Sequence, residues 1–196
     1  MGFQKTGTTS LGLALEKLGY QVCGYSPFRE FAKNEDFDVA AFQQKALELS
    51  EQYDAFKDSP WPLFYKEMDE RYPGSKFILV ERDKDKWIKS VVDDFGKYPN
   101  SIRNYTYGVP VPTGNEDIFI RRFERHCAEV RDYFDARPED LLDINLDKGE
   151  VNWENICSFL GEPLPDTPWP RANTKNNKRM RMVLYKIMSR LSFNKN

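Results

Sequence analysis

A lysine, a glycine and four hydroxyl side chains lie close together near the start of the sequence, in the segment Lys5-Thr-Gly-Thr-Thr-Ser10. A glycine-containing loop that opens a helix points backbone N–H groups and the positive end of the helix dipole at an anion. The segment therefore predicts a phosphate-binding loop, with an ordinary helix-capping turn as the alternative reading. The residues expected to hold the phosphate are Lys5, Thr6, Gly7, Thr8, Thr9 and Ser10.

The order of these residues distinguishes the loop from a Walker A loop. In a Walker A loop the lysine follows the final glycine and precedes Ser or Thr, whereas Lys5 comes before Gly7. The run Lys-Thr-Gly-Thr-Thr-Ser-Leu at positions 5–11 resembles the 5′-phosphosulfate loop of the sulfotransferase superfamily, which has the form Pro-Lys-x-Gly-Thr-Thr-x-Leu. Gln4 stands where that loop has proline, and we expect this to change the stiffness of the loop more than its charge.

A second candidate anion site follows the most apolar strand of the sequence. Residues 76–81, Lys-Phe-Ile-Leu-Val-Glu, form a continuous apolar run typical of a strand buried in a parallel sheet. Arg82 follows directly and offers a fork of N–H donors, and Ser90 offers a hydroxyl eight positions later. A surface ion pair is the alternative role for Arg82. The segment resembles the 3′-phosphate-binding segment of the sulfotransferase superfamily.

The two resemblances together imply a particular donor and reaction. The donor would be 3′-phosphoadenosine 5′-phosphosulfate (PAPS), bound across the carboxyl edge of the sheet and released as adenosine 3′,5′-bisphosphate, with no metal ion. Lys5 would neutralise the charge that builds on the leaving phosphate oxygen. The acceptor would be a hydroxyl or an amine on a small molecule, a carbohydrate or a lipid.

Residues 153–165, which contain Phe-Leu-Gly and Pro-x-Pro, resemble the segment that closes many sulfotransferase domains. We expect this segment to pack in the core.

A general base must take the proton of the acceptor, and Asp58 is the candidate. In cytosolic relatives a catalytic histidine lies before the 3′-phosphate segment and is followed two residues later by proline. Asp58-Ser59-Pro60 occupies the matching place, although the aspartate could instead cap the next helix. His126, the single histidine, is the alternative base, because an imidazole titrates near neutral pH. It falls inside a helical pattern, so packing or a supporting hydrogen bond is its expected role.

Helical and strand patterns alternate along the chain. We expect helices at 8–19, 39–53, 60–72, after Trp87, 116–134 and 152–160, strands at 19–23, 55–58, 76–81 and 140–145, and a long loop at 96–115 that covers a site. This order predicts an α/β fold, a three-layer sandwich with a largely parallel central sheet like that of P-loop NTPases. Tyrosines of the loop are candidates for stacking on an acceptor ring.

Length and composition favour one folded domain over residues 1–196. The chain is 40% hydrophobic with a net charge of −2, and its three widely spaced cysteines indicate neither a disulfide framework nor a zinc site. These features, with the lack of a long apolar run, predict a soluble, cytoplasmic protein. Met1 lies only four residues before Lys5, where a strand leading into the loop needs more, so the natural start is left open.

The C-terminal segment 171–196 carries eight Lys and Arg residues and no acid. Apolar residues recur at helical spacing over 177–193, which predicts a basic amphipathic helix. Docking on the domain is the expected role, and contact with the 3′-phosphate, an anionic membrane or the acceptor is the alternative. No nucleic-acid partner is expected, because the net charge is negative and no recognition motif is present. The sequence does not indicate an oligomeric state.

Two other functions remain compatible with the same residues. A P-loop nucleotide kinase or NTPase would use residues 77–83 as its metal-binding strand, although the position of Lys5 argues against it. A non-catalytic nucleotide-binding protein would keep both anion sites without a working base.

Overall fold

The structure is a computed structural model and describes residues 1–34 and 36–172. The predicted basic helix at 177–193 lies outside the described residues. The helices are α1 Thr8–Lys17, α2 Val39–Ser50, α3 Tyr65–Arg71, α4 Lys84–Phe95, α5 Ser101–Tyr107, α6 Glu116–Phe134 and α7 Trp153–Leu160. The strands are β1 Val22–Cys23, β2 Ala55–Phe56, β3 Phe77–Glu81 and β4 Leu141–Asn145. Short 3-10 turns lie at Ser26–Phe28, Trp61–Leu63 and Pro138–Asp140.

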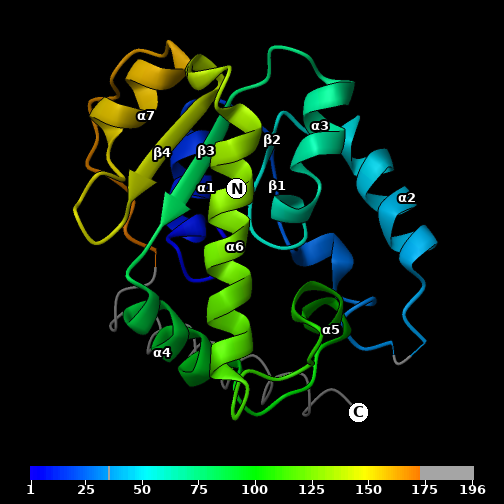
Figure 1. The fold of residues 1–196 in the computed structure, drawn as a ribbon. Helices are drawn as coiled ribbons and strands as arrows, with labels where there is room; N and C mark the ends of the chain where they lie inside the picture. Colours follow the sequence, from blue (N-terminus) through cyan, green and yellow to red (C-terminus); the bar gives the residue numbers. More distant parts are fainter. Residues whose placement is uncertain (35, 173–196) are drawn as a thin grey trace, which may run out of the picture.

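The described strands are all paired in parallel, which confirms the predicted mixed α/β fold. β1 pairs with β2, with Val22 opposite Ala55, and β3 pairs with β4, with Phe77 opposite Leu141. The strands form two separate two-stranded sheets, and a cavity of about 490 Å³ lies between β2 and β3. Parallel neighbours require helical crossovers, which α2 and α6 provide (Figure 1).

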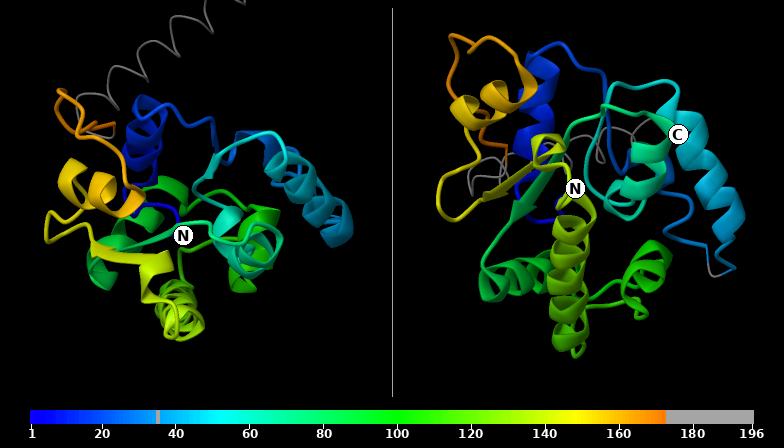
Figure 2. Two further views of the ribbon diagram at one scale, coloured as in Figure 1. Left: turned by 90° about the horizontal axis from the view of Figure 1, so that it is seen from above. Right: turned by 45° about the horizontal axis from the view of Figure 1, so that its top comes forward.

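Helices cover both faces of the β3–β4 pair, because successive side chains of a strand point to opposite sides. Phe77 and Leu79 belong to the core cluster that contains the buried residues of α6. Ile78 and Val80 belong to a second cluster with Leu11 of α1 and with α7. Figure 2 shows α6 on one side of these strands and α1 on the other. The continuous apolar run of β3 is thus explained by burial on both faces.

The segment 96–115, expected to be a loop, contains the helix α5, so that expectation was wrong for residues 101–107. The side chain of Asn100 caps the helix by accepting from the backbone N–H of Arg103, and Gly108 ends it with φ 79°. Ile102 anchors the helix because it is 1% exposed. The glycines and prolines that suggested a loop flank this helix and lie outside it.

No helix within 1–34 and 36–172 is long and apolar enough to cross a membrane. Cys23, Cys127 and Cys157 are buried and free. Burial raises the pKa of all three thiols, which keeps them protonated and unreactive near neutral pH.

Candidate active site

The loop ahead of α1 has the backbone geometry of an anion-binding turn. Lys5 and Gly7 both take positive φ values, 71° and 85°. A non-glycine residue with positive φ is uncommon and marks a backbone held by its surroundings, often at a functional site. α1 begins at Thr8, and no side chain caps its first turn. The first N–H groups of a helix have no acceptor inside the helix, so they face outward from this loop.

Two buried side chains fix the shape of the loop. The hydroxyl of Thr6 donates to the carbonyl of Phe3 at 2.7 Å, and Thr6 is fully buried. The side chain of Gln4 donates to the hydroxyl of Tyr107 at 2.7 Å, and the backbone carbonyl of Gln4 accepts from Nε1 of Trp87 at 2.9 Å. Gln4 therefore ties the loop to α4 and α5, and a proline at this position could not make the bond to Tyr107. Thr6 supports the loop from inside. Lys5 and Gly7 are partly exposed, and Thr8 to Ser10 form the first turn of α1.

Arg82 lies at the carboxyl end of β3 and contacts the first loop directly. Its Nη1 donates to the carbonyl of Lys5 at 3.2 Å, so the two predicted anion sites adjoin each other. Its Nε lies 3.8 Å from Oδ2 of Asp147, which follows β4. This buried Nε has no hydrogen-bond partner among the residues that the structure describes. A buried guanidinium N–H without an acceptor fits a site that receives a phosphate oxygen.

One face of α4 is turned toward the same loop. The side chain of Asp83 caps the helix by accepting from the N–H of Lys86 at 3.0 Å. Trp87 reaches the loop through Gln4, and Asp94 reaches it through Lys5. Ser90 lies between them, three and four residues away on the same helix, so it shares their face. The 3′-phosphate role of Ser90 stays a prediction, and its position on this face of α4 is compatible with it.

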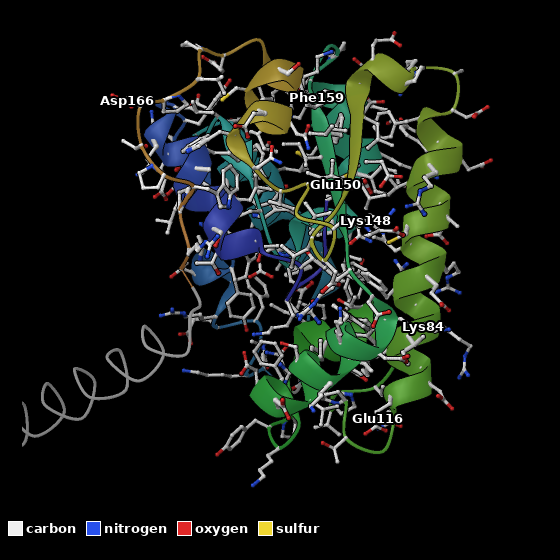
Figure 3. The ribbon with its side chains drawn as sticks, turned by 90° about the vertical axis from the view of Figure 1, so that its left-hand side faces the viewer. Lys84, Glu116, Lys148, Glu150, Phe159 and Asp166 are labelled. Atoms are coloured by element: carbon white, nitrogen blue, oxygen red, sulfur yellow. The ribbon has the colours of Figure 1, made fainter. Side chains whose placement is uncertain are left out.

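The start of α4 and the loop after β4 lie at the same end of the parallel strands. Figure 3 shows Lys84 at the beginning of α4, below the loop that carries Lys148 and Glu150. Oδ2 of Asp147, in that loop, accepts from the backbone N–H of Asp83 at 2.8 Å, which holds the two segments together. The carboxyl ends of neighbouring strands are where open α/β sheets bind ligands.

Asp94 is a site residue that no motif predicted. Its Oδ2 accepts a hydrogen bond from Nζ of Lys5, and the two side chains are 28% and 12% exposed. The carboxylate thus pairs with the lysine that the sequence predicted to bind an anionic ligand. The sequence carried a weak signal for this pairing, because Asp94 is four residues after Ser90 on a helix that follows Arg82.

Replacing Asp94 with asparagine is expected to strengthen the binding of adenosine 3′,5′-bisphosphate. Loss of the competing charge frees Lys5, and because this pair is part-exposed we expect a gain of about two- to tenfold in affinity. Isothermal titration calorimetry of the wild type and the variant measures the change. Asp93→Asn, one position away on α4, is the matched control and should leave the affinity unchanged. Weaker binding by Asp94→Asn would show that the carboxylate supports the site instead of competing for it.

Asp58 follows β2 in a strained backbone conformation, with φ 64°. Its Oδ1 accepts from the backbone N–H of the next residue, Ser59, at 2.8 Å. No side chain caps the turn that follows at Trp61–Leu63, so the capping role considered for Asp58 is not seen. Burial raises the pKa of Asp58, and the positive charges of Lys57 and Lys5 partly oppose this rise. The carboxyl therefore lies within electrostatic reach of the loop lysine, and its carboxylate form is a stronger base than usual.

His126 is placed for packing, as its helical pattern predicted. Its ring stacks on Phe3 with centroids 4.4 Å apart, and the residue is 1% exposed. Its Nε2 lies 3.1 Å from the carbonyl of Met1. Burial lowers the pKa of His126 to about 3, so the ring is neutral near neutral pH and faces the core. Of the two titratable residues considered as bases, only Asp58 is electrostatically coupled to Lys5.

The segment after β4 packs behind the loop. Trp153 of α7 donates from Nε1 to the carbonyl of Thr167 at 2.7 Å and meets the ring of Trp169 edge-on. Further on, the N–H of Ala172 donates to Oγ of Ser10 at 3.2 Å, so the Ser10 hydroxyl binds the backbone of the last described residue.

Within 1–34 and 36–172, no group of three or more His, Cys, Asp or Glu residues is placed to hold a metal ion.

Similarity to known proteins shows the family to which the chain belongs. A family model described as a sulfotransferase domain matches residues 1–113 and 93–178, and the chain belongs to this family. It is similar to Ava biosynthesis cluster protein M of Aspergillus versicolor, with 25% identity over 217 residues that cover 90% of this chain and 80% of the relative. A crystal structure of a sulfotransferase from Alicyclobacillus acidocaldarius shares the fold, with a TM-score of 0.52, 16% identity, and coverage of 94% and 90% of the two chains.

Proposed function

We propose that this chain transfers a sulfuryl group from PAPS to a hydroxyl or amine acceptor. The observation that carries the proposal is the bond between Nη1 of Arg82 and the carbonyl of Lys5, at 3.2 Å. This bond joins the helix-opening loop to the arginine after β3, which supports a single site for a ligand with two phosphate-type groups. Single-phosphate ligands would need only the loop.

The donor would be held at both ends by residues of this chain. Lys5 and the backbone N–H groups of Gly7, Thr8 and Thr9 would bind the 5′-phosphosulfate, with Thr6 shaping the loop and Ser10 placed behind it. Arg82 would bind the 3′-phosphate through its Nε–H, which has no hydrogen-bond partner among the described residues, and Ser90 would add its hydroxyl. When bound, PAPS supplies an activated sulfuryl group with a nucleotide phosphate as leaving group.

The transfer needs a base, a positive charge and alignment. Asp58 would take the proton of the acceptor as the acceptor oxygen or nitrogen forms its bond to sulfur. The bond between sulfur and the bridging oxygen breaks, and its electron pair stays on the 5′-phosphate of adenosine 3′,5′-bisphosphate. Lys5 would neutralise the charge that gathers on that oxygen. The step balances without a metal ion or a redox partner, because the proton passes to Asp58 and the electron pair to the leaving group.

The acceptor is proposed to be a small molecule. The relative from Aspergillus versicolor is named for a biosynthesis cluster, which favours such an acceptor over a carbohydrate or a lipid. A transfer assay with labelled PAPS across phenol, alcohol, amine, sugar and lipid acceptors tests this choice. Transfer to lipids or sugars alone would overturn it. Hydrolysis of ATP that depends on magnesium would instead favour the nucleotide kinase or NTPase reading.

Replacing Arg82 with methionine is expected to remove the preference for a 3′-phosphate. Charge-assisted hydrogen bonds contribute about 1.5–3 kcal/mol, so the affinity for adenosine 3′,5′-bisphosphate should fall by about 10- to 100-fold. The affinity for adenosine 5′-monophosphate should change much less. Calorimetric titration with the two nucleotides measures both values, and Arg71→Met, on α3, is the control.

The comparison between the two nucleotides separates a specific loss from damage to the site. Because Arg82 also bonds to the loop through Lys5, a distorted loop would weaken both nucleotides equally. An equal loss would therefore contradict the 3′-phosphate role. Tight nucleotide binding by the wild type without transfer to any acceptor would instead favour a non-catalytic binding protein.

A further inference from the structure

The side chain of Lys57 lies in a space that two glycines leave open. Lys57 follows β2 and comes directly before Asp58. A Cβ atom at Gly12 of α1 would lie 2.3 Å from both Cδ and Cε of Lys57, and one at Gly24, just after β1, would lie 3.4 Å from its Nζ. Carbon atoms in contact are about 3.5–4.0 Å apart, so any larger residue at position 12 would displace the lysine. The fold therefore fixes where this ammonium group lies.

Lys57 differs from the other basic residues of the proposed site, because the described residues give it no carboxylate partner. Lys5 pairs with Asp94, and Nε of Arg82 lies 3.8 Å from Oδ2 of Asp147. Lys57 is half-buried, and its side chain makes no hydrogen bond or ion pair with residues 1–34 and 36–172. Holding a lysine side chain in one place costs conformational entropy, and here no ion pair offsets that cost. The N–H donors of this ammonium group are therefore available to an anion.

Lys57 lies on the acceptor side of the proposed site. The donor is assigned to Lys5, the start of α1 and Arg82, which follows β3. Gly24 and Lys57 follow the strands of the other sheet, β1 and β2, which Figure 1 shows on the side of the molecule that carries α2 and α3. Asp58, the proposed base, is the next residue, and consecutive Cα atoms are about 3.8 Å apart. The charge of Lys57 lowers the pKa of Asp58 more than that of Lys5 does. An anion bound to Lys57 would thus lie close to the group whose proton Asp58 takes.

We propose that the ammonium group of Lys57 binds a carboxylate of the acceptor, so that the enzyme prefers small acceptors with a negative charge near the hydroxyl or amine that is sulfated. This inference rests on the proposed function, because it takes Asp58 as the base. A carboxylate matches a single unpaired ammonium group, whereas a phosphate group carries a charge of about −1.5 to −2 and would call for a second cation. The bond is charge-assisted, and a neutral acceptor would leave the ammonium group without a partner.

Matched pairs of acceptors test this preference in the transfer assay with labelled PAPS. Each pair contains a carboxylate and its primary amide, which has nearly the same shape and no charge. The compounds para-hydroxyphenylpropionate, hydroxybutyrate and aminobutyrate supply a phenol, an alcohol and an amine acceptor. The readout is the ratio of kcat/KM for the carboxylate to kcat/KM for the amide, at a pH above the acidic limb of the profile. Because the effect of Lys57 on the pKa of Asp58 is common to both acceptors of a pair, it cancels in this ratio.

The wild type should favour the carboxylate by at least about tenfold in one or more pairs, the size of effect that a charge-assisted hydrogen bond gives. Lys57→Met should remove this preference, and Lys57→Arg, which keeps the charge, should retain most of it. Gly12→Ala should also weaken the preference because its Cβ displaces the lysine, while Tm is maintained because alanine favours a helix. Lys66→Met, at an exposed position of α3, is the control and should keep the ratio of the wild type.

The outcomes separate the carboxylate preference from sulfuryl transfer itself. Transfer without a preference for the carboxylate in any pair would overturn the role of Lys57 and leave the proposed function in place, as would a preference that persists in Lys57→Met. A large loss of affinity for adenosine 3′,5′-bisphosphate in Lys57→Met would also overturn it, because Lys57 would then serve the donor.

If no acceptor is sulfated, the proposed function fails and binding decides the role of Lys57. The carboxylates are then titrated by calorimetry into the complex of the full chain with adenosine 3′,5′-bisphosphate. Binding that Lys57→Met abolishes would support the role. Binding that Lys57→Met leaves unchanged, or no binding of any carboxylate, would overturn it.

Discussion

Replacing Lys5 with alanine is expected to lower kcat for sulfuryl transfer by about 10²- to 10³-fold and to leave the fold intact. Loss of one preorganised donor that stabilises developing charge lowers kcat by about this factor in other enzymes. The side chain lies at the surface of the site with Asp94 as an ionic partner, so its removal opens no cavity in the core. Transfer of labelled sulfuryl from PAPS at saturating donor measures kcat. Circular dichroism and Tm confirm that the variant is folded.

The physical basis of this prediction is where charge develops during the reaction. Lys5 stands beside the open first turn of α1, and its positive charge matters most when the bridging oxygen of the donor becomes an anion. The effect should therefore be larger on kcat than on the binding of adenosine 3′,5′-bisphosphate. Lys17→Ala, at the opposite end of α1, is the control and should retain full activity. Full activity of the Lys5 variant would remove the loop from the mechanism.

Replacing Asp58 with asparagine is expected to lower kcat by about 10²- to 10⁴-fold, the usual contribution of general base catalysis. Asparagine keeps an oxygen that can accept from the N–H of Ser59, so the strained turn should persist. Nucleotide affinity should stay close to that of the wild type, because the carboxylate is assigned to the acceptor side. Asp54→Asn, on the other side of β2, is the matched control. A large loss of nucleotide affinity with kcat preserved would contradict the assignment.

The pH profile gives Asp58 a signature that a structural role would lack. Burial raises the pKa of this carboxyl, and only the ionised form can accept a proton. The activity should thus increase as the pH rises through that raised pKa, and it should be low at pH values below the pKa. Lys57 holds the pKa down through its positive charge, so Lys57→Met should move the acidic limb of the profile to higher pH. An unmoved limb, or a shift to lower pH, would show that another group controls it.

The sequence was sufficient to locate the loop and the arginine, because their positions depend on local structure. Glycine and hydroxyl residues at the start of a helix predict an anion-binding loop, because the backbone N–H groups supply the hydrogen-bond donors. Arg82 could be placed at a strand end because the apolar run before it stops at Glu81. Since neighbouring parallel strands end at the same edge, these two local predictions also imply that the residues meet, as the bond to the Lys5 carbonyl shows.

The contacts that depend on side-chain direction could not be predicted in the same way. Asp94 pairs with Lys5 from 89 residues away, and Gln4 reaches Tyr107 across 103 residues. The helical spacing from Ser90 to Asp94 was only a weak signal for the first pair and nothing signalled the second, since each pair depends on the angle at which α4 and α5 pack on the loop. The helix α5 was missed because the glycines and prolines around it outweighed the cap at Asn100. Tyr107 is consequently buried against Gln4 and is not available to stack on an acceptor.

The division of the strands into two pairs was also beyond the sequence patterns. Each strand was identified from its apolar residues, and such patterns predict burial without saying which edges are in contact. The register of β3 with β4 and the cavity beside Ile78 and Val80 emerge only from the arrangement of the helices around them.

A crystal structure of the complex with adenosine 3′,5′-bisphosphate tests the central claim most directly. We expect one nucleotide to bridge the site, with its 5′-phosphate against Nζ of Lys5 and the first N–H groups of α1, and its 3′-phosphate against Arg82 and the Ser90 hydroxyl. Lys5 should then have left Asp94 for the phosphate. A nucleotide bound elsewhere, or bound with its 3′-phosphate in solvent and the Lys5–Asp94 pair unbroken, would contradict the account.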